Sequence, residues 1–223
     1  MAHPDDELLG LGATMNKIIF NFNVKAHVVI LGEGLTSRLE IRDRNKWNKE
    51  LKIHKGNINN AQTAIGYHSN SIYDFPDNRF DSIPILDIIK VIEKEKIEFK
   101  PDIVFTHHGG DLNIDHQITF SAVLTACRPM KNEIVKHIIT FETPSGTEWQ
   151  SPTDPRHFLP NIFISVSDLN MDAKIKGMES YEFEKRKFPH PRSPEALRIQ
   201  AKRWGVINGV ENAEAFCLIR SIN

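Results

Sequence analysis

A short run of residues that can bind a metal ion opens the chain: Met1-Ala2-His3-Pro4-Asp5-Asp6-Glu7. His3 and Asp6 stand three residues apart, which is ligand-like spacing for Zn²⁺, an ion that accepts imidazole nitrogen and carboxylate oxygen. Asp5 is left over and could act as a base. The acidic residues could instead only favour the positive end of a helix. The His3-Pro4 pair in front of them, together with a second His-Asp pair far downstream, favours the metal site.

The second pair lies in a polar loop, His107-His108-Gly109-Gly110-Asp111-Leu112-Asn113-Ile114-Asp115-His116. This loop follows an apolar run and leads into a helical pattern, and open α/β sheets bind their ligands in loops of this kind. Asp115 could cap the start of the helix. It could also accept a hydrogen bond from a pocket histidine, as carboxylates around zinc do. The sequence leaves both roles open.

Together, the A-H-P-D-D-E string and the downstream D-H pair resemble the PIG-L/LmbE-type family of zinc-dependent N-acetylglucosaminyl deacetylases. The resemblance implies that His3, Asp6 and His116 bind zinc and that Asp5 is the general base. In the family's H-x-D-H element the leading histidine is the natural donor to the tetrahedral oxyanion, and here Asn113 replaces it. Asn113 can donate a neutral hydrogen bond but cannot give up a proton.

The resemblance therefore implies hydrolysis of the N-acetyl group of an N-acetylglucosamine-type sugar or sugar conjugate. Zinc would lower the pKa of its water to about 7 and polarise the acetyl carbonyl. Asp5 would take the proton of that water and return it to the departing amine. Two alternatives keep the same ligands: an Fe(II) enzyme, since two histidines and a carboxylate also hold non-haem iron, and a catalytically silent sugar-binding protein.

Two further residues are candidates for the site. Arg79 lies in a P-D-x-R loop that borders the active site in the resembling family, where it would hold a substrate oxygen or the product acetate. The alternative is a surface ion pair with Asp77 or Asp81. His190, in the rigid segment Pro189-His190-Pro191-Arg192, is a candidate to supply the missing imidazole, as are His107 and His108. Its alternative is a plain surface hinge.

The composition excludes several classes of partner. The 223 residues include 40% apolar and 26% charged side chains, as in ordinary soluble globular proteins. A formal net charge of −1 offers no field that would gather nucleic acid or an anionic membrane. Cys127 and Cys217 lack metal or redox spacing, which predicts buried free thiols. With no signal pattern or apolar membrane span, we expect a cytoplasmic protein that acts on an amino sugar, and a homo-oligomer stays open.

Alternating helical and strand patterns predict an α/β fold: one three-layer, Rossmann-like domain over residues 1–223 with a mostly parallel sheet. The expected helices are 8–22, 39–67 in two pieces broken near Gly56, 83–97, 116–127, 169–184 and 195–207. The expected strands are 24–31, 71–75, 103–106, 134–141, 161–166 and 213–219.

One central strand is expected but has no residues to form it. In the resembling family an apolar strand runs straight into the A-H-P-D-D-E string, as parallel α/β folds place catalytic loops at the carboxyl ends of strands. Only Met1 and Ala2 precede His3, whereas a strand needs about five residues. We therefore expect either a start upstream of Met1 or residues from elsewhere in that position.

Overall fold

The computed structural model describes residues 1–38 and 40–222, which form a mixed α/β fold. Its helices are α1 (Asp6–Phe22), α2 (Asn48–Ile65), α3 (Ile85–Phe99), α4 (Ile114–Ala126), α5 (Asp168–Ser180) and α6 (Pro194–Asn208). Its strands are β1 (His27–Gly32), β2 (Ser69–Phe75), β3 (Ile103–His107), β4 (His137–Phe141), β5 (Ile162–Ser165) and β6 (Ala213–Ser221). The α/β class expected from the alternating patterns is confirmed.

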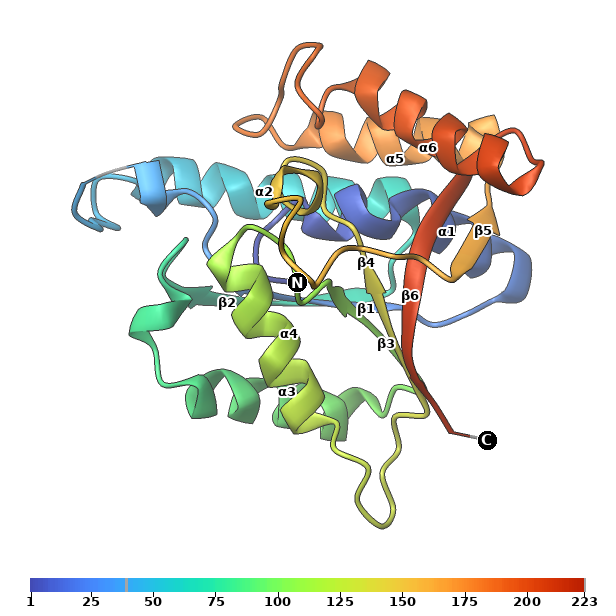
Figure 1. The fold of residues 1–223 in the computed structure, drawn as a ribbon. Coiled ribbons are helices and arrows are strands. Elements are labelled where there is room, and N and C mark those ends of the chain that lie inside the picture. The colour runs from blue at the N-terminus through green and yellow to red at the C-terminus, as the bar shows by residue number, and fades with distance from the viewer. Residues whose placement is uncertain (39, 223) are drawn as a thin grey trace.

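Strands form the middle layer, and helices cover both of its faces (Figure 1). One sheet holds β1 and β2, and the other has the order β3-β4-β6-β5. The pairs β1–β2 and β3–β4 are parallel, whereas β6 runs antiparallel to β4 and β5. Helices α1, α2, α5 and α6 lie on one face, and α3 and α4 lie on the other. The parallel strands therefore flank the place where the chain begins.

Helix α1 packs closely against the sheet because of one glycine. A Cβ atom on Gly10 would lie 2.1 Å from Cδ2 of Phe141 in β4, so any larger residue would push the helix away from the strand. The apolar residues of α1 that face inward include Leu8, Leu11 and Met15, and each is buried. This contact fixes the first turn of α1, and with it the acidic motif, above the sheet.

The structure differs from the sequence-based elements in the polar segment 39–67. We expected two helices broken near Gly56, but α2 is one helix from Asn48 to Ile65 that runs through Gly56 without a break. Gly56 has open space around it, so nothing there forces a bend. Residues 40–47 are not α-helical, and Leu39 lies outside the described residues. Both cysteines are buried free thiols, as predicted.

The two sheets do not meet directly. Met1 and Ala2 lie at the carboxyl ends of β1 and β3, which are the neighbouring edges of the two sheets. The Met1 amino group donates to Val29 O at 2.6 Å, and the amides of Leu31 and Gly32 donate to the carbonyls of Met1 and Ala2. Beyond Met1 the space between the strands is a cavity of about 640 Å³. In the described part of the chain, no helix is long and apolar enough to cross a membrane.

Candidate metal centre

The acidic motif is held in one shape by its own backbone. Asp5 precedes α1 with a left-handed φ of 98°, a conformation that non-glycine residues adopt rarely and often at functional sites. Its carbonyl accepts the amides of Leu8 and Leu9, and its amide donates to Glu7 Oε2 at 3.0 Å. The His3 amide donates to Asp6 Oδ2 at 2.7 Å. These local bonds turn His3 and Asp6 toward the same point.

His116, on the first turn of α4, completes a group with His3 and Asp6. One ligand atom from each residue lies within 4.8 Å of the others, and all three side chains are buried. Asp6 Oδ2 is 3.5 Å from His3 Nδ1 and 3.5 Å from His116 Nε2. Asp6 Oδ1 and His116 Nε2 are buried without a hydrogen-bond partner within the described residues. Buried polar atoms are seldom left unpaired, so this group fits a metal ion that would bind those atoms.

Each histidine of the group has a carboxylate on its far side. His3 Nε2 lies 2.9 Å from Asp115 Oδ2, and the other Asp115 oxygen accepts the Phe80 amide. His116 Nδ1 lies 3.1 Å from Asp111 Oδ1. Carboxylates in these positions orient metal-binding histidines and fix their tautomer. Of the two roles open for Asp115, the structure therefore favours the one beside a histidine.

Charges around His116 favour a cation there. Burial disfavours a charged ring, but Asp6 and Asp111 outweigh it and raise the pKa of His116 to about 9. Burial raises the pKa of Asp6, yet His116 and His107 outweigh it and hold that pKa well below the usual value. A site in which carboxylates outweigh burial suits a protonated ring or a divalent ion.

Asp77 belongs to a second group that could hold a metal, together with His3 and Asp115. Asp77 Oδ1 lies 3.4 Å from His3 Nε2, the nitrogen that already bonds Asp115. Its other oxygen accepts the hydroxyl and amide of Ser37. We favour the group of His3, Asp6 and His116, because Asp6 Oδ1 and His116 Nε2 lack hydrogen-bond partners among the described residues. In the second group, the oxygen atoms of Asp77 and Asp115 already have partners.

Asp5 faces a guanidinium group rather than the histidines. Arg192 Nη1 lies 2.9 Å from Asp5 Oδ2, and Arg192 Nε donates to Ser145 Oγ at 2.7 Å. Glu184 is a second carboxylate near the same guanidinium, at 3.7 Å. Burial raises the pKa of Asp5 well above its usual value, although Arg192 opposes the shift. A carboxylate with a raised pKa can hold a proton nearer to neutral pH, which general acid–base catalysis requires.

Asn113 caps helix α4. Its Oδ1 accepts the Asp115 amide at 2.8 Å, and its Nδ2 donates to Asn78 Oδ1 at 2.7 Å. Helix α4 starts at Ile114, two residues earlier than expected, so Asp115 lies inside it and does not cap it. Asparagine is a favoured cap because its carbonyl accepts a free amide of the first turn. The residue in place of the family's histidine therefore has a structural role in this chain.

The three candidate imidazoles have different surroundings. His107 stacks on His116 with ring centroids 3.9 Å apart, and its Nε2 accepts the Ala2 amide. Burial, followed by the charge of His116, lowers the pKa of His107 to about 3, so it stays neutral. His108 turns away and bonds the Arg156 carbonyl. His190 packs against Trp149, and its Nδ1 accepts the Arg192 amide.

Arg79 donates to the Glu40 carbonyl at 3.1 Å. The alternative of an ion pair with Asp77 or Asp81 is not seen among residues 1–38 and 40–222. Asp77, on the same loop, turns toward His3 instead. Arg79 therefore has no carboxylate partner among the described residues.

Three residues near the motif were not identified from the sequence in these roles: Asp77, Asp111 and Arg192. Asp111 lies in the same loop as His116, and loop carboxylates before a ligand histidine are a usable signal. Asp77 and Arg192 come from loops 70 or more residues away, and their spacing gives no signal. Their placement depends on how β2 and the segment before α6 pack.

Comparison with known proteins places the chain in a family. The model of the family PIG-L, described as GlcNAc-PI de-N-acetylase, matches residues 1–127, more than half of the chain. The uncharacterized deacetylase YaiS of Escherichia coli K12 is 27% identical over 186 residues, covering 81% of this chain and 87% of YaiS.

Solved structures share the fold. The N,N'-diacetylchitobiose deacetylase of Pyrococcus horikoshii superposes with a TM-score of 0.74 at 18% identity, covering 98% of this chain and 81% of that one. The 4-carboxy-2-hydroxymuconate hydratase GalB of Pseudomonas putida superposes equally well, with a TM-score of 0.74 at 17% identity over 100% and 95% of the two chains. Since one neighbour is a deacetylase and the other a hydratase, the fold alone does not select the reaction.

Proposed function

This chain belongs to the PIG-L family, and from that premise we propose that it is a zinc-dependent hydrolase that removes the N-acetyl group from an N-acetylglucosamine-type sugar or sugar conjugate. One observation carries the proposal: the buried group of His3, Asp6 and His116 has an oxygen and a nitrogen atom that lack partners among the described residues. Hydrolysis needs a polarised carbonyl and an activated water, and a metal held by these three residues leaves a position for both.

Zinc suits the donor set, which is two imidazole nitrogens and one carboxylate oxygen. When bound, zinc lowers the pKa of a water to about 7 and polarises a carbonyl oxygen. Asp115 orients the ring of His3, and Asp111 orients the ring of His116. These outer carboxylates keep both rings in the tautomer that turns a bare nitrogen toward the shared point.

Asp5 is the proposed general base. Its raised pKa allows it to accept a proton from the attacking water near neutral pH and return it to the departing amine. Arg192 holds one carboxylate oxygen, so the side chain keeps one orientation while the other oxygen stays available. Because Arg192 also binds Ser145, its own position is fixed by the loop after β4.

Asn113, His190 and Arg79 have proposed roles at the rim of the site. Asn113 Nδ2 is the neutral donor available for the oxyanion once it leaves Asn78. His190 is placed beside the Asp5–Arg192 pair through its bond to the Arg192 amide, from where it can approach a leaving group. Arg79 offers a guanidinium to a substrate oxygen or to acetate.

An acetate-release screen tests the proposal. The purified protein is incubated with N-acetylated sugars and sugar conjugates in the presence of Zn²⁺, Fe²⁺ or chelator, while metal content is measured separately. We expect acetate release with zinc, and a loss of about 10² to 10⁴ in turnover for Asp5→Asn with its zinc content unchanged. Sugar binding without acetate release would favour the silent binding protein, and activity with iron alone would favour the Fe(II) enzyme. Full activity in Asp5→Asn would refute the assignment of the base.

A further inference from the structure

Glu7 is a buried carboxylate of the acidic motif that belongs to neither candidate metal-binding group of the described residues. It lies in the first turn of α1 and is only 2% exposed. Its Oε2 accepts the Asp5 amide at 3.0 Å, and its Oε1 accepts the hydroxyl of Tyr181. A buried carboxylate with a donor on each oxygen is held in one orientation. Glu7 therefore links the backbone of Asp5 to the residue that follows α5.

The bond from Glu7 stabilises an unusual backbone at Asp5. Asp5 has a φ of 98°, in the left-handed region, and its side chain makes no capping bond to α1. A non-glycine residue keeps such a conformation only where its surroundings over-determine it. In a capping box, a glutamate reaches back to the amide of the N-cap residue, whose own side chain bonds the helix. Here Glu7 makes the first of these bonds, and the Asp5 carboxylate instead faces Arg192.

Tyr181 holds Glu7 from a distant part of the chain. The two residues are 174 positions apart, and the Tyr181 side chain is fully buried. Its ring packs edge-on against His54 of α2, with ring centroids 5.6 Å apart. Packing of the ring fixes the position of the hydroxyl. The bond to Glu7 therefore carries the placement of α5 to the turn at Asp5.

The turn after α5 also approaches Asp5 from its carboxylate side. The Glu184 amide donates to the Tyr181 carbonyl at 3.0 Å, and Glu184 Oε2 lies 3.7 Å from Arg192 Nη1. The same Arg192 nitrogen lies 2.9 Å from Asp5 Oδ2. One turn of the chain therefore reaches Asp5 at two points, through Glu7 at its amide and through Arg192 at its carboxylate.

We propose that Glu7 and Tyr181 are positioning residues for Asp5: together they fix the left-handed turn that sets the direction of its carboxylate. The inference rests on the proposed function, in which Asp5 is the general base, and adds that this base is placed through its backbone. A purely structural pair would alter only the stability of the protein. A positioning pair also alters kcat while KM stays the same.

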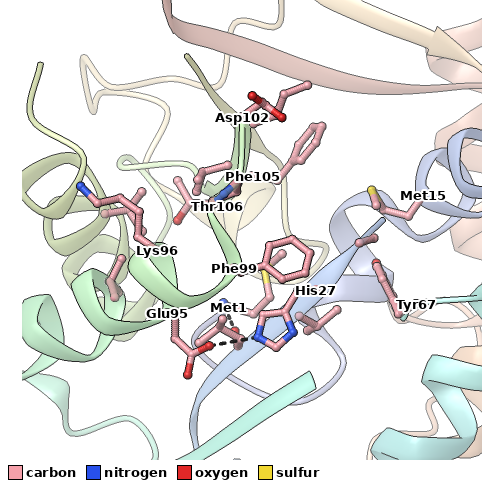
Figure 2. A pocket seen from close by; sticks show the side chains of 18 of the residues that line it. Met1, Met15, His27, Tyr67, Glu95, Lys96, Phe99, Asp102, Phe105 and Thr106 are labelled. Atoms are coloured by element: carbon pink, nitrogen blue, oxygen red, sulfur yellow. Dashed lines mark hydrogen bonds and ion pairs between the residues drawn. The ribbon is translucent and has the colours of Figure 1, made fainter. Parts of the chain in front are cut away.

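Tyr181→Phe tests the pair, because it removes the hydroxyl and keeps the ring. The matched control is Tyr67→Phe. The Tyr67 hydroxyl donates to the backbone carbonyl of Glu7 at 3.3 Å, and Tyr67 lines the cavity between β1 and β3 (Figure 2). Both tyrosines are buried, so the two substitutions remove the same atom from similar surroundings. Of the two, Tyr181→Phe is the one that removes a bond to the Glu7 carboxylate.

A second pair of variants separates the bonds of Glu7 from its size. Glu7→Gln keeps an oxygen for the Asp5 amide and a polar group for Tyr181, whereas Glu7→Met keeps similar bulk and loses both bonds. We expect Glu7→Gln to retain kcat within about 3-fold and Glu7→Met to lose at least as much as Tyr181→Phe. Rescue by the amide would show that the bonds of Glu7 are what matters.

The readouts are zinc content, exchange of the Asp5 amide followed by NMR, and kcat and KM for acetate release. In Tyr181→Phe we expect the Asp5 amide to exchange about 10-fold faster, because its partner is less restrained. We expect kcat to fall about 10-fold at unchanged KM and zinc content, since a small misplacement of a catalytic group lowers the rate steeply. Tyr67→Phe should keep both quantities within about 2-fold.

Unchanged exchange of the Asp5 amide in Tyr181→Phe would overturn the proposal, and so would equal losses of kcat in the two tyrosine variants. A lower melting temperature with unchanged kcat would also refute it, because it would leave Tyr181 a structural role alone. The exchange measurement needs no substrate. If the original protein released no acetate from any sugar, the proposed function would fail, and the exchange rates would still decide whether Tyr181 holds the turn.

Discussion

The two regions on either side of Met1 and Ala2 are held together in different ways. On the carboxyl side, the metal centre is cross-linked by side chains: Asp115 bonds His3, and Arg192 bonds Asp5. On the amino side, a cavity of about 640 Å³ lies between β1 and β3 and is lined mostly by apolar side chains. Buried carboxylates and local turns thus fix the residues of the candidate metal centre, whereas apolar packing forms the walls of the cavity.

The difference also separates function from stability. The candidate metal centre keeps charged groups buried, and a cation would offset the electrostatic cost of that burial. The lowered pKa of Asp6 and the raised pKa of His116 indicate that the site favours a positive charge. Apolar side chains that line the cavity make fewer dispersion contacts than side chains in the enclosed core. Changes in the first region should alter metal binding and turnover, and changes in the second should alter the free energy of unfolding.

The largest expected effect is that of His116→Ala. Removing this ring deletes one of three ligands, so bound metal and acetate release should both be lost. His108→Ala is the matched control, because His108 follows the same strand but bonds the Arg156 carbonyl. Metal content by elemental analysis and acetate release check the pair. Retained zinc in His116→Ala would break the assignment of the metal centre.

A smaller loss is expected for Arg192→Met. Without the guanidinium, Asp5 loses the partner that fixes its orientation, and we expect kcat to fall about 100-fold with zinc content unchanged. Arg186→Met is the control, since Arg186 contacts Glu184 but has no bond to Asp5 within the described residues. Arg192→Met combined with Asp5→Asn should be no worse than Asp5→Asn alone. Additive losses would show that Arg192 acts independently of Asp5.

Asp111→Asn should weaken zinc binding about 10- to 100-fold, because the carboxylate beside His116 Nδ1 raises the basicity of that ring. The measurement is competition against a chelating dye. Asp172→Asn is the control, since Asp172 is exposed and pairs with Arg198 on the surface. An unchanged zinc affinity in Asp111→Asn would show that the metal centre does not depend on its outer carboxylates.

The smallest effect distinguishes the cavity between β1 and β3 from the rest of the core. Met171 is fully buried and Met15 lines the cavity, so Met171→Ala and Met15→Ala remove the same atoms from a helix. We expect Met171→Ala to lower the free energy of unfolding by about 3 to 4 kcal/mol and Met15→Ala by about 2 kcal/mol, because Met15 already lacks contacts on one side. Urea unfolding measures both. Equal losses would indicate that the side chains around the cavity are as tightly packed as those of the enclosed core.

The sequence predicted which residues lie together better than it predicted their surroundings. His3 and Asp6 are three residues apart along the motif, and a backbone bond within the motif brings them together. His116 follows a strand that is parallel to its neighbour, so its place at the same edge of the fold could be expected from topology. The sequence showed that Asn113 replaces the family's histidine, but it did not predict that Asn113 caps α4, because capping depends on where the helix starts.

The sequence by itself determined the α/β class and the positions of most helices and strands, because hydrophobic periodicity is a local property of the chain. The grouping of His3, Asp6 and His116 was expected from the family resemblance of two short motifs, and the structure brings the three side chains together. Only the tertiary structure decided that Arg192 meets Asp5 across 187 positions and that Asp77 approaches His3. It also decided that α2 is unbroken and that a cavity lies between β1 and β3. Contacts between distant segments depend on how whole elements pack, and no local pattern encodes that packing.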